Sequence, residues 1–305
     1  MKILITGGSG FIGHQVVRAL ESEHQLCILS RHPAIAREKL GVQHQYRANL
    51  DEMSNLDEFD VVINLAGEPI ANKRWSDTQK EKICNSRWEL TTRLSELTQL
   101  SQIPPSVFIS ASAIGIYGDR EEQRVDESLL VPQKKANDNL PFPQIVCQKW
   151  EEIALSAASE QTRVCIIRIG LVLGLSGGAL PKMLPAFKLG LGGTIASGKQ
   201  GMSWIHQQDL VDLITFLINH ETCSGIFNAT APHPVSNHEF SKALGYALSR
   251  PTILPMPGFI LNTLLGEMAQ LLTQGQYVIP TRSLDAGFTF KHPQLNYALA
   301  DVLES

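Results

Sequence analysis

The chain has 305 residues, 43% of them hydrophobic and 18% charged, and this composition excludes intrinsic disorder as a description of the whole chain. The 26 Lys and Arg residues against 30 Asp and Glu residues give a formal net charge of -4, which argues against a general nucleic-acid-binding protein. The five cysteines form no C-x-x-C pair, so neither a disulfide framework nor a zinc ribbon is expected. With an N-terminal apolar run too short for a signal peptide, the sequence predicts a cytoplasmic protein.

Short apolar strands alternate with helical stretches through the first half of the chain. The predicted strands are 2–6, 25–30, 43–47, 60–65, 105–110 and 163–169, and the predicted helices are 11–22, 76–100 and 144–159. Near-continuous apolar strands separated by helices are typical of a parallel sheet covered on both faces. The sequence therefore predicts an α/β fold with a Rossmann-like, doubly wound parallel sheet.

The second half of the chain is richer in glycine and proline. Helices are expected near 180–189 and at 209–219, and a strand at 225–229. The expected division is a Rossmann domain over 1–169, to which 204–229 returns, and a smaller C-terminal substrate lobe made of 170–203 and 230–305. The apolar stretch 253–272 contains two prolines, an Asn and a Glu, so it predicts a buried helix after a proline-rich turn rather than a membrane span.

A glycine-rich loop follows the first strand and opens the first helix. It reads Thr6-Gly7-Gly8-Ser9-Gly10-Phe11-Ile12-Gly13, with G-x-x-G-x-x-G and G-x-G-x-x-G registers. Glycines there allow a tight turn, close approach of a pyrophosphate to the backbone, and close packing of the helix on the sheet. The amides at the helix N-terminus favour negative charge. The loop therefore predicts dinucleotide binding.

The second predicted strand ends at Arg31, with no acidic residue nearby. An acid there would bind the ribose hydroxyls of NAD, whereas an Arg pairs with the 2′-phosphate of NADP. Arg31 thus favours NADP(H) over NAD(H), although a solvated surface Arg would look the same in the sequence.

Further segments resemble the short-chain dehydrogenases/reductases. Asn64-Leu65-Ala66-Gly67 resembles their N-x-A-G turn, and Ser110-Ala111-Ser112 resembles their catalytic serine segment. With the glycine loop, these segments are similar to the extended, epimerase-like branch of that superfamily. The narrower resemblance is to the YfcH-like family of nucleoside-diphosphate-sugar epimerase-like proteins, carried by GEPIANKRW (67–75), SASAIGIYG (110–118), WEEIA (150–154), GGALPKMLPAFKLGLGG (177–193) and WIHQQDL (204–210).

This resemblance implies NADP bound across the strand ends, with Leu65, Ala66, Gly67 and Ser110 beside it. It also implies a sugar nucleotide or another small polar compound as substrate, and a homodimer as a family-level expectation. No nucleic-acid or membrane partner is expected.

The catalytic pattern of the superfamily is incomplete in this chain. There, a Tyr transfers the proton and a Lys four residues later lowers its pKa, but none of the five tyrosines here has such a Lys. The best alignment places Cys147 at the Tyr position and Glu151 at the Lys position, and a carboxylate would raise the pKa of a thiol. Ser112 and Tyr117 remain as catalytic candidates that orient the substrate, the alternatives being a serine that satisfies backbone groups and a packing aromatic.

Other polar residues are candidates for substrate contacts. In the resembled family the segments containing Arg74, Trp75 and Arg87 face the cleft, which suits an anionic substrate; helix-end charges are the equal alternative. The glycine-rich stretch 190–206 predicts a substrate loop carrying Lys199, Trp204 and His206, although a lone His is more often only hydrogen-bonded. No metal site is expected, because His233 and His238 lack further ligands.

Three functional hypotheses follow. The first is an NADP-dependent epimerase or oxidoreductase that lacks the usual Tyr-x-x-x-Lys pair. The second is a binding protein that senses NADPH without turning it over. The third, a scaffold with a degenerate Rossmann fold, is weakened by the intact glycine loop.

Overall fold

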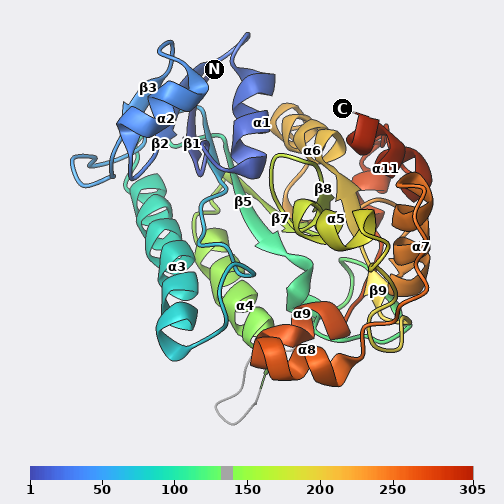
Figure 1. The fold of residues 1–305 in the computed structure, drawn as a ribbon. Helices are drawn as coiled ribbons and strands as arrows, with labels where there is room; N and C mark the ends of the chain where they lie inside the picture. The colour runs from blue at the N-terminus through green and yellow to red at the C-terminus, as the bar shows by residue number, and fades with distance from the viewer. Residues whose placement is uncertain (132–139, 305) are drawn as a thin grey trace.

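The computed structural model describes residues 1–131 and 140–304. Its centre is a seven-stranded sheet in the order β11-β7-β5-β4-β1-β2-β3, and every neighbouring pair is parallel (Figure 1). The strands are β1 (Lys2–Thr6), β2 (Gln25–Leu29), β3 (Gln45–Arg47), β4 (Val61–Asn64), β5 (Val107–Ala113), β7 (Arg163–Ile169) and β11 (Gly225–Ala229). The predicted Rossmann-like α/β fold is confirmed.

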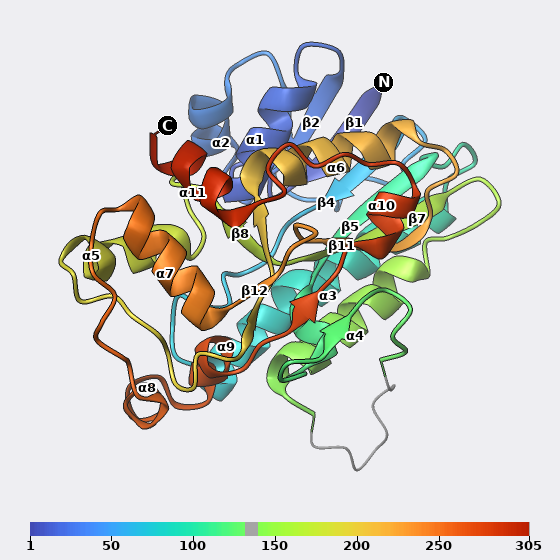
Figure 2. The ribbon, with the colours of Figure 1, turned by 90° about the vertical axis from the view of Figure 1, so that its right-hand side faces the viewer.

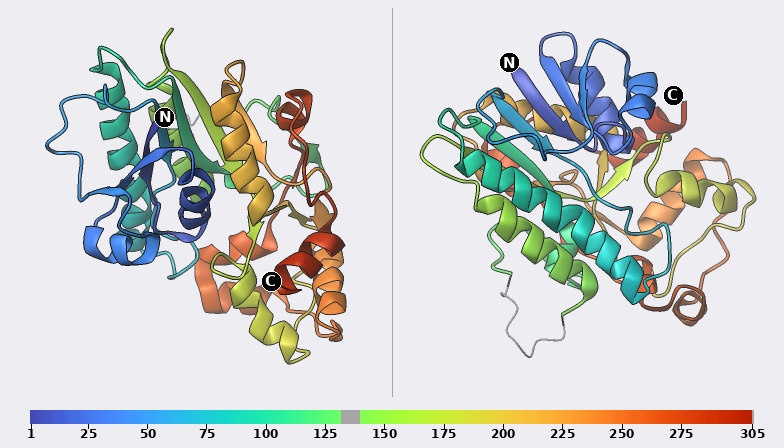
Figure 3. Two further views of the ribbon diagram at one scale, coloured as in Figure 1. Left: turned by 90° about the horizontal axis from the view of Figure 1, so that it is seen from above. Right: turned by 90° about the vertical axis from the view of Figure 1, so that its left-hand side faces the viewer.

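Helices cover both faces of this sheet because successive strand residues point to opposite sides. Ile3 and Ile5 pack in one cluster with α1 (Phe11–Leu20) and α6 (Gln207–Asn219), whereas Leu4 packs in another with α3 (Asp77–Gln99) and α4 (Phe142–Leu155). Helices α3 and α4 lie side by side (Figure 3, right panel). The sequence analysis missed α2 (Pro33–Leu40), a short helix that buries only Ala36 and Leu40.

Apart from α6 and β11, the chain after β7 forms a second group of elements with its own apolar cluster. They are β8 (Leu171–Leu173), α5 (Leu180–Lys188), β9 (Gly201–Met202), β10 (Trp204–His206), β12 (Val235–Ser236), α7 (Asn237–Ala247), α8 (Gly258–Leu265), η2 (Gly266–Ala269), α9 (Gln270–Thr273), β13 (Tyr277–Val278), α10 (Thr281–Asp285) and α11 (Leu295–Glu304). Two short elements, η1 (Ile114–Tyr117) and β6 (Arg124–Val125), precede α4. Helices α5, α7 and α8 gather on one side of the sheet (Figure 2), where Leu180, Phe187, Trp204 and Phe240 share one apolar cluster.

The expectation of a buried helix over 253–272 was wrong. The segment divides into α8, η2 and α9, and Leu261 is the one buried residue of α8 while Phe259 is 71% and Leu264 61% exposed. Pro257 delays the start of the helix, and Gly266, with φ of +60°, ends it after eight residues. Within the described ranges no helix is long and apolar enough to cross a membrane.

Candidate dinucleotide site

The glycine loop joins β1 to α1 with its backbone packed against backbone. Gly7 has φ of +70°, and a Cβ there would lie 2.8 Å from the carbonyl carbon of Leu65. A Cβ on Gly13 would lie 2.1 Å from the carbonyl oxygen of Gly7. Gly10 precedes α1 and supplies no capping side chain, so the amides of the first turn have no side-chain cap. Uncapped amides at a helix N-terminus form an anion-binding site.

The turn after β4 forms the neighbouring wall and is held by a buried hydrogen-bond network. Thr6 Oγ1 donates to Asn64 Oδ1 (2.7 Å) and accepts from the amide of Ala66 (3.2 Å). Asn64 Nδ2 donates to Thr91 Oγ1 (2.8 Å) and, more distantly, to Ser110 Oγ (3.4 Å). Thr6 and Ser110 are fully buried. Their side chains therefore hold the turn in place from the protein interior and do not line an open surface.

Phe11, the first residue of α1, lies under a second glycine-rich loop. Cβ atoms built on Gly174, Gly177 and Gly178 would all come within 3.0 Å of the Phe11 side chain. A side chain at any of these positions would press on Phe11, so the glycines let the segment before α5 lie close against the start of α1. This contact brings the second half of the chain directly to the glycine loop.

Ser112 lies at the carboxyl end of β5 and belongs to a buried charged cluster. Its Oγ donates to Glu151 Oε1 (2.6 Å), and Arg168 forms two hydrogen bonds to the same carboxylate, from Nε (2.9 Å) and Nη2 (2.8 Å). The side chains of Arg168 and Glu151 are 4% and 6% exposed. Burial alone lowers the pKa of Arg168, but the hydrogen bonds and charge of Glu151 raise it overall. Arg168, which sequence analysis missed, could have been noticed as a charge inside an apolar strand.

Cys147 and Tyr117 lie beside this ion pair. Burial, followed by the charge of Glu151, raises the pKa of the Cys147 thiol to about 11, which confirms the expected effect of that carboxylate. Tyr117 is fully buried and its hydroxyl donates to Asn228 Oδ1 (2.8 Å), with the Arg168 guanidinium 4.9 Å from its ring centroid. Burial raises the pKa of Tyr117 despite the nearby Arg168. Neither group is an ionised base at neutral pH.

The other predicted substrate residues lie in different surroundings. Trp75 donates from Nε1 to the carbonyl of Ile70 (2.9 Å), Lys199 pairs on the surface with Glu122 (3.0 Å), and Trp204 is fully buried in the apolar cluster of the second half. Arg74 is exposed and its guanidinium lies beside Gly266. Arg31 is exposed just beyond β2, with no side-chain hydrogen bond to the described part of the chain.

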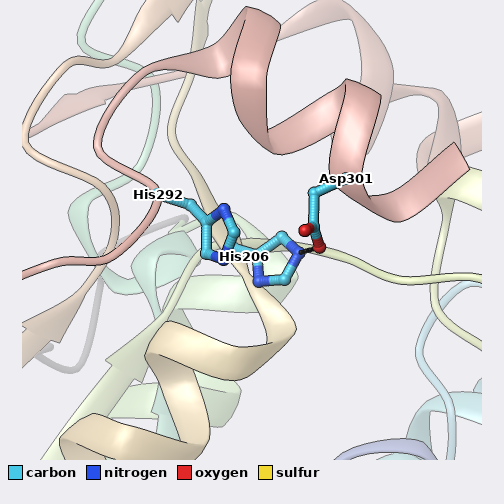
Figure 4. A group of neighbouring side chains, drawn as sticks. All are labelled: His206, His292 and Asp301. Atoms are coloured by element: carbon cyan, nitrogen blue, oxygen red, sulfur yellow. Dashed lines mark ion pairs between the residues drawn. The ribbon is translucent and has the colours of Figure 1, made fainter. Parts of the chain in front are cut away.

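His206 faces the C-terminal helix α11 (Figure 4). Its Nδ1 accepts the amide of Gln208, which caps α6, and its Nε2 lies 3.2 Å from Asp301 Oδ2. The ring stacks on His292 with centroids 3.8 Å apart. These three side chains have the spacing of a metal site, but an Nδ1 that accepts a hydrogen bond leaves the ring proton on Nε2. A metal-bound His instead donates a hydrogen bond from its second nitrogen. The arrangement therefore favours a contact between the Nε2 proton and Asp301 over a bound metal ion.

Acid is expected to weaken the fold through His206. Burial, then the charge of His292, lowers its pKa to about 4 from 6.5, so the unfolded chain binds the proton more tightly. Stability should therefore fall as the pH drops from 6.5 to 4, by about 3 kcal/mol from this group. Urea unfolding of the protein and of His206→Asn, which keeps a capping side chain, measures this contribution. An equal pH dependence of both proteins would contradict it.

Fold and loop define the class of the molecule: a Rossmann-like protein with a glycine turn and an uncapped helix N-terminus at the switch from β1 to α1. Residues 3–229 match the model of the NAD dependent epimerase/dehydratase family, and the chain belongs to that family. Residues 256–302 match a further model, described as a domain of unknown function, DUF1731.

Relatives cover almost the whole chain. An epimerase family protein of Arabidopsis thaliana, the chloroplastic SDR39U1 homolog, is 38% identical over 100% of this chain and 87% of its own length. The Bacillus subtilis epimerase family protein YfhF is 35% identical over 99% of this chain and 98% of its own.

Solved structures show the same likeness. The human epimerase family protein SDR39U1, crystallised with NADPH, superposes with a TM-score of 0.90 at 32% identity and covers 100% of both chains. The UDP-glucuronic acid 4-epimerase of Bacillus cereus, with a TM-score of 0.74 at 18% identity over 100% of this chain and 96% of its own, shares the fold.

Proposed function

We propose that the chain binds NADP(H) and is an epimerase-like oxidoreductase acting on a small polar substrate, as a member of the YfcH-like branch. The observation that carries the proposal is the uncapped start of α1 beside Gly7 and Gly13, where a side chain would collide with the backbone and displace the amides that would bind a pyrophosphate. The NADPH in the crystals of human SDR39U1 supports the same cofactor here. Bound NADP(H) would supply hydride transfer. The chain would position the cofactor and substrate and provide the electrostatic field around them. Five buried free cysteines support a reducing compartment such as the cytoplasm.

The residues present fit this cofactor in the order of the strand ends. The loop at β1 would hold the pyrophosphate, Arg31 beyond β2 would meet the 2′-phosphate, and the turn at Ala66 and Gly67 would line the path towards β5. Ser112 lies at the end of β5 and would reach the substrate side of that path.

Arg31→Ala should weaken NADPH binding by about 10-fold or more while leaving NADH affinity almost unchanged. The reason is that the guanidinium has no other partner among the described residues and only NADPH carries the 2′-phosphate. Fluorescence titration with both nucleotides measures the effect, and Arg18→Ala, on the outer part of α1, serves as a control that removes the same charge. Equal NADPH affinities for the Arg31 variant and the unaltered protein would refute the assignment.

A second candidate is a sensor that binds NADPH without chemistry. The best alignment places Glu151 at the position of the superfamily's catalytic Lys. The ion pair between Glu151 and Arg168 therefore favours this second candidate. Ser112 and Tyr117 would then only shape the site. NADPH deuterated at the reactive C4 position distinguishes the candidates: transfer of label to UDP-keto-sugars or simple carbonyl compounds supports the enzyme, and tight binding with no transfer supports the sensor.

A further inference from the structure

Arg87 lies on α3, directly beneath the turn that follows β4. A Cβ on Gly67 would lie 2.8 Å from its guanidinium carbon, and that carbon is 5.1 Å from the ring centroid of Trp150. Its charge also acts on the Cys147 thiol and lowers the pKa of that group against the effect of burial. The guanidinium therefore lies between the turn after β4 and the Cys147 side of α4, beyond the pyrophosphate loop at β1.

Among the described residues, the hydrogen bonds of this guanidinium all come from Nη1. Nη1 donates to the carbonyl oxygens of Glu68 (2.9 Å) and Ile83 (3.0 Å) and to Ser86 Oγ at the longer distance of 3.5 Å. Nε and Nη2 donate to no group in the described part of the chain. Neither nitrogen is among the fully covered polar atoms that lack a partner, so each keeps some accessible area.

Arg87 is also a partly buried charge without an ion pair. It takes part in none of the ion pairs between described residues, and burial lowers its pKa in spite of the distant charge of Glu68. Charges removed from water are normally paired, because desolvation otherwise opposes folding. By contrast, Arg74 on the neighbouring loop is exposed, so the desolvation free energy of its charge is small.

We propose that Arg87 binds an anionic group of the substrate, a carboxylate or a phosphate, through Nε and Nη2. These two nitrogens form the edge of the guanidinium that matches two anionic oxygens at once, and Nη1 fixes its direction. A substrate group is favoured over the cofactor pyrophosphate because the glycine loop already provides for the pyrophosphate at β1. The inference rests on the proposed function, which gives the path of the bound cofactor along the strand ends. It narrows the class of substrates to small anions.

The test uses NADPH-loaded protein and two probes, inorganic phosphate and malonate, titrated calorimetrically. Arg87→Met should weaken binding of at least one probe by about 10-fold or more, because the bidentate contact is lost, while NADPH affinity stays within about twofold. Lys82→Met, which removes an exposed charge from the same helix, should change neither. The stronger probe shows whether the site prefers carboxylate or phosphate.

Three results would overturn the proposal: no binding of either probe to the unaltered protein, equal binding to the Arg87 variant, or a parallel loss of NADPH affinity, which would make Arg87 a cofactor group. A protein that fails to bind NADPH refutes the proposed function instead, and the probes are then titrated without nucleotide. Should Arg87→Met not fold, phenylglyoxal labelling of the unaltered protein decides: phosphate or malonate must protect Arg87 and leave Arg74 reactive, and unprotected Arg87 contradicts the proposal.

Discussion

Gly13→Ala should abolish measurable NADPH binding at concentrations that saturate the unaltered protein. The new Cβ would lie 2.1 Å from the carbonyl oxygen of Gly7 and 2.7 Å from Cα of Gly8, so backbone must move on one side or the other. Displacing the start of α1 removes amide donors from the proposed phosphate site. Each hydrogen bond to a charged group contributes about 1.5–3 kcal/mol, so losing two lowers the affinity by about 100-fold or more.

The same substitution should destabilise the fold by about 1–3 kcal/mol, the usual cost of overpacking. NADPH fluorescence titration and urea unfolding measure the two effects separately. Ser22→Ala is the control, because Ser22 is an exposed residue just beyond the far end of α1 and lies outside the glycine loop. Normal NADPH affinity in a folded Gly13→Ala protein would show that this turn does not bind the cofactor.

Arg168→Met should lower the free energy of unfolding at neutral pH by about 3–5 kcal/mol, since it leaves the Glu151 carboxylate buried without its cation. Ser112 would remain as one hydrogen-bond partner of that carboxylate.

Urea unfolding at neutral pH tests this expectation. The double variant Arg168→Met with Glu151→Gln should recover most of the loss, because a neutral amide oxygen still accepts from Ser112 and no charge is left buried. Lys149→Met is the control on α4: it breaks an exposed pair with Glu152, whose side chains are 50% and 71% exposed, and should cost less than about 1 kcal/mol. A loss as small for Arg168→Met would mean that the buried pair contributes no stability.

The position of this ion pair explains why the proton-transfer residues could not be assigned from sequence. Spacing along one helix identified Cys147 and Glu151 as the residues in the Tyr and Lys positions, and showed that they are no chemical substitute. The partner of Glu151 comes from a different strand, β7, where Arg168 is paired in register with Ser112 of β5. No local pattern connects these residues, because the contact depends on which strands become neighbours in the sheet.

Local physics determined much of this protein directly from the sequence. Apolar strands with helices between them dictated a parallel sheet covered on both faces, and glycines at 7, 10 and 13 dictated a tight turn that opens the first helix, since both follow from backbone sterics and side-chain periodicity. Only the tertiary structure decided which polar side chains are buried and which partners they contact. Tyr117 is buried against Asn228, His206 turns towards α11, and Nε and Nη2 of Arg87 donate to no other described residue. Those outcomes depend on desolvation and on partners distant in the chain, whereas the strands and the glycine turn depend on neighbours within a few residues.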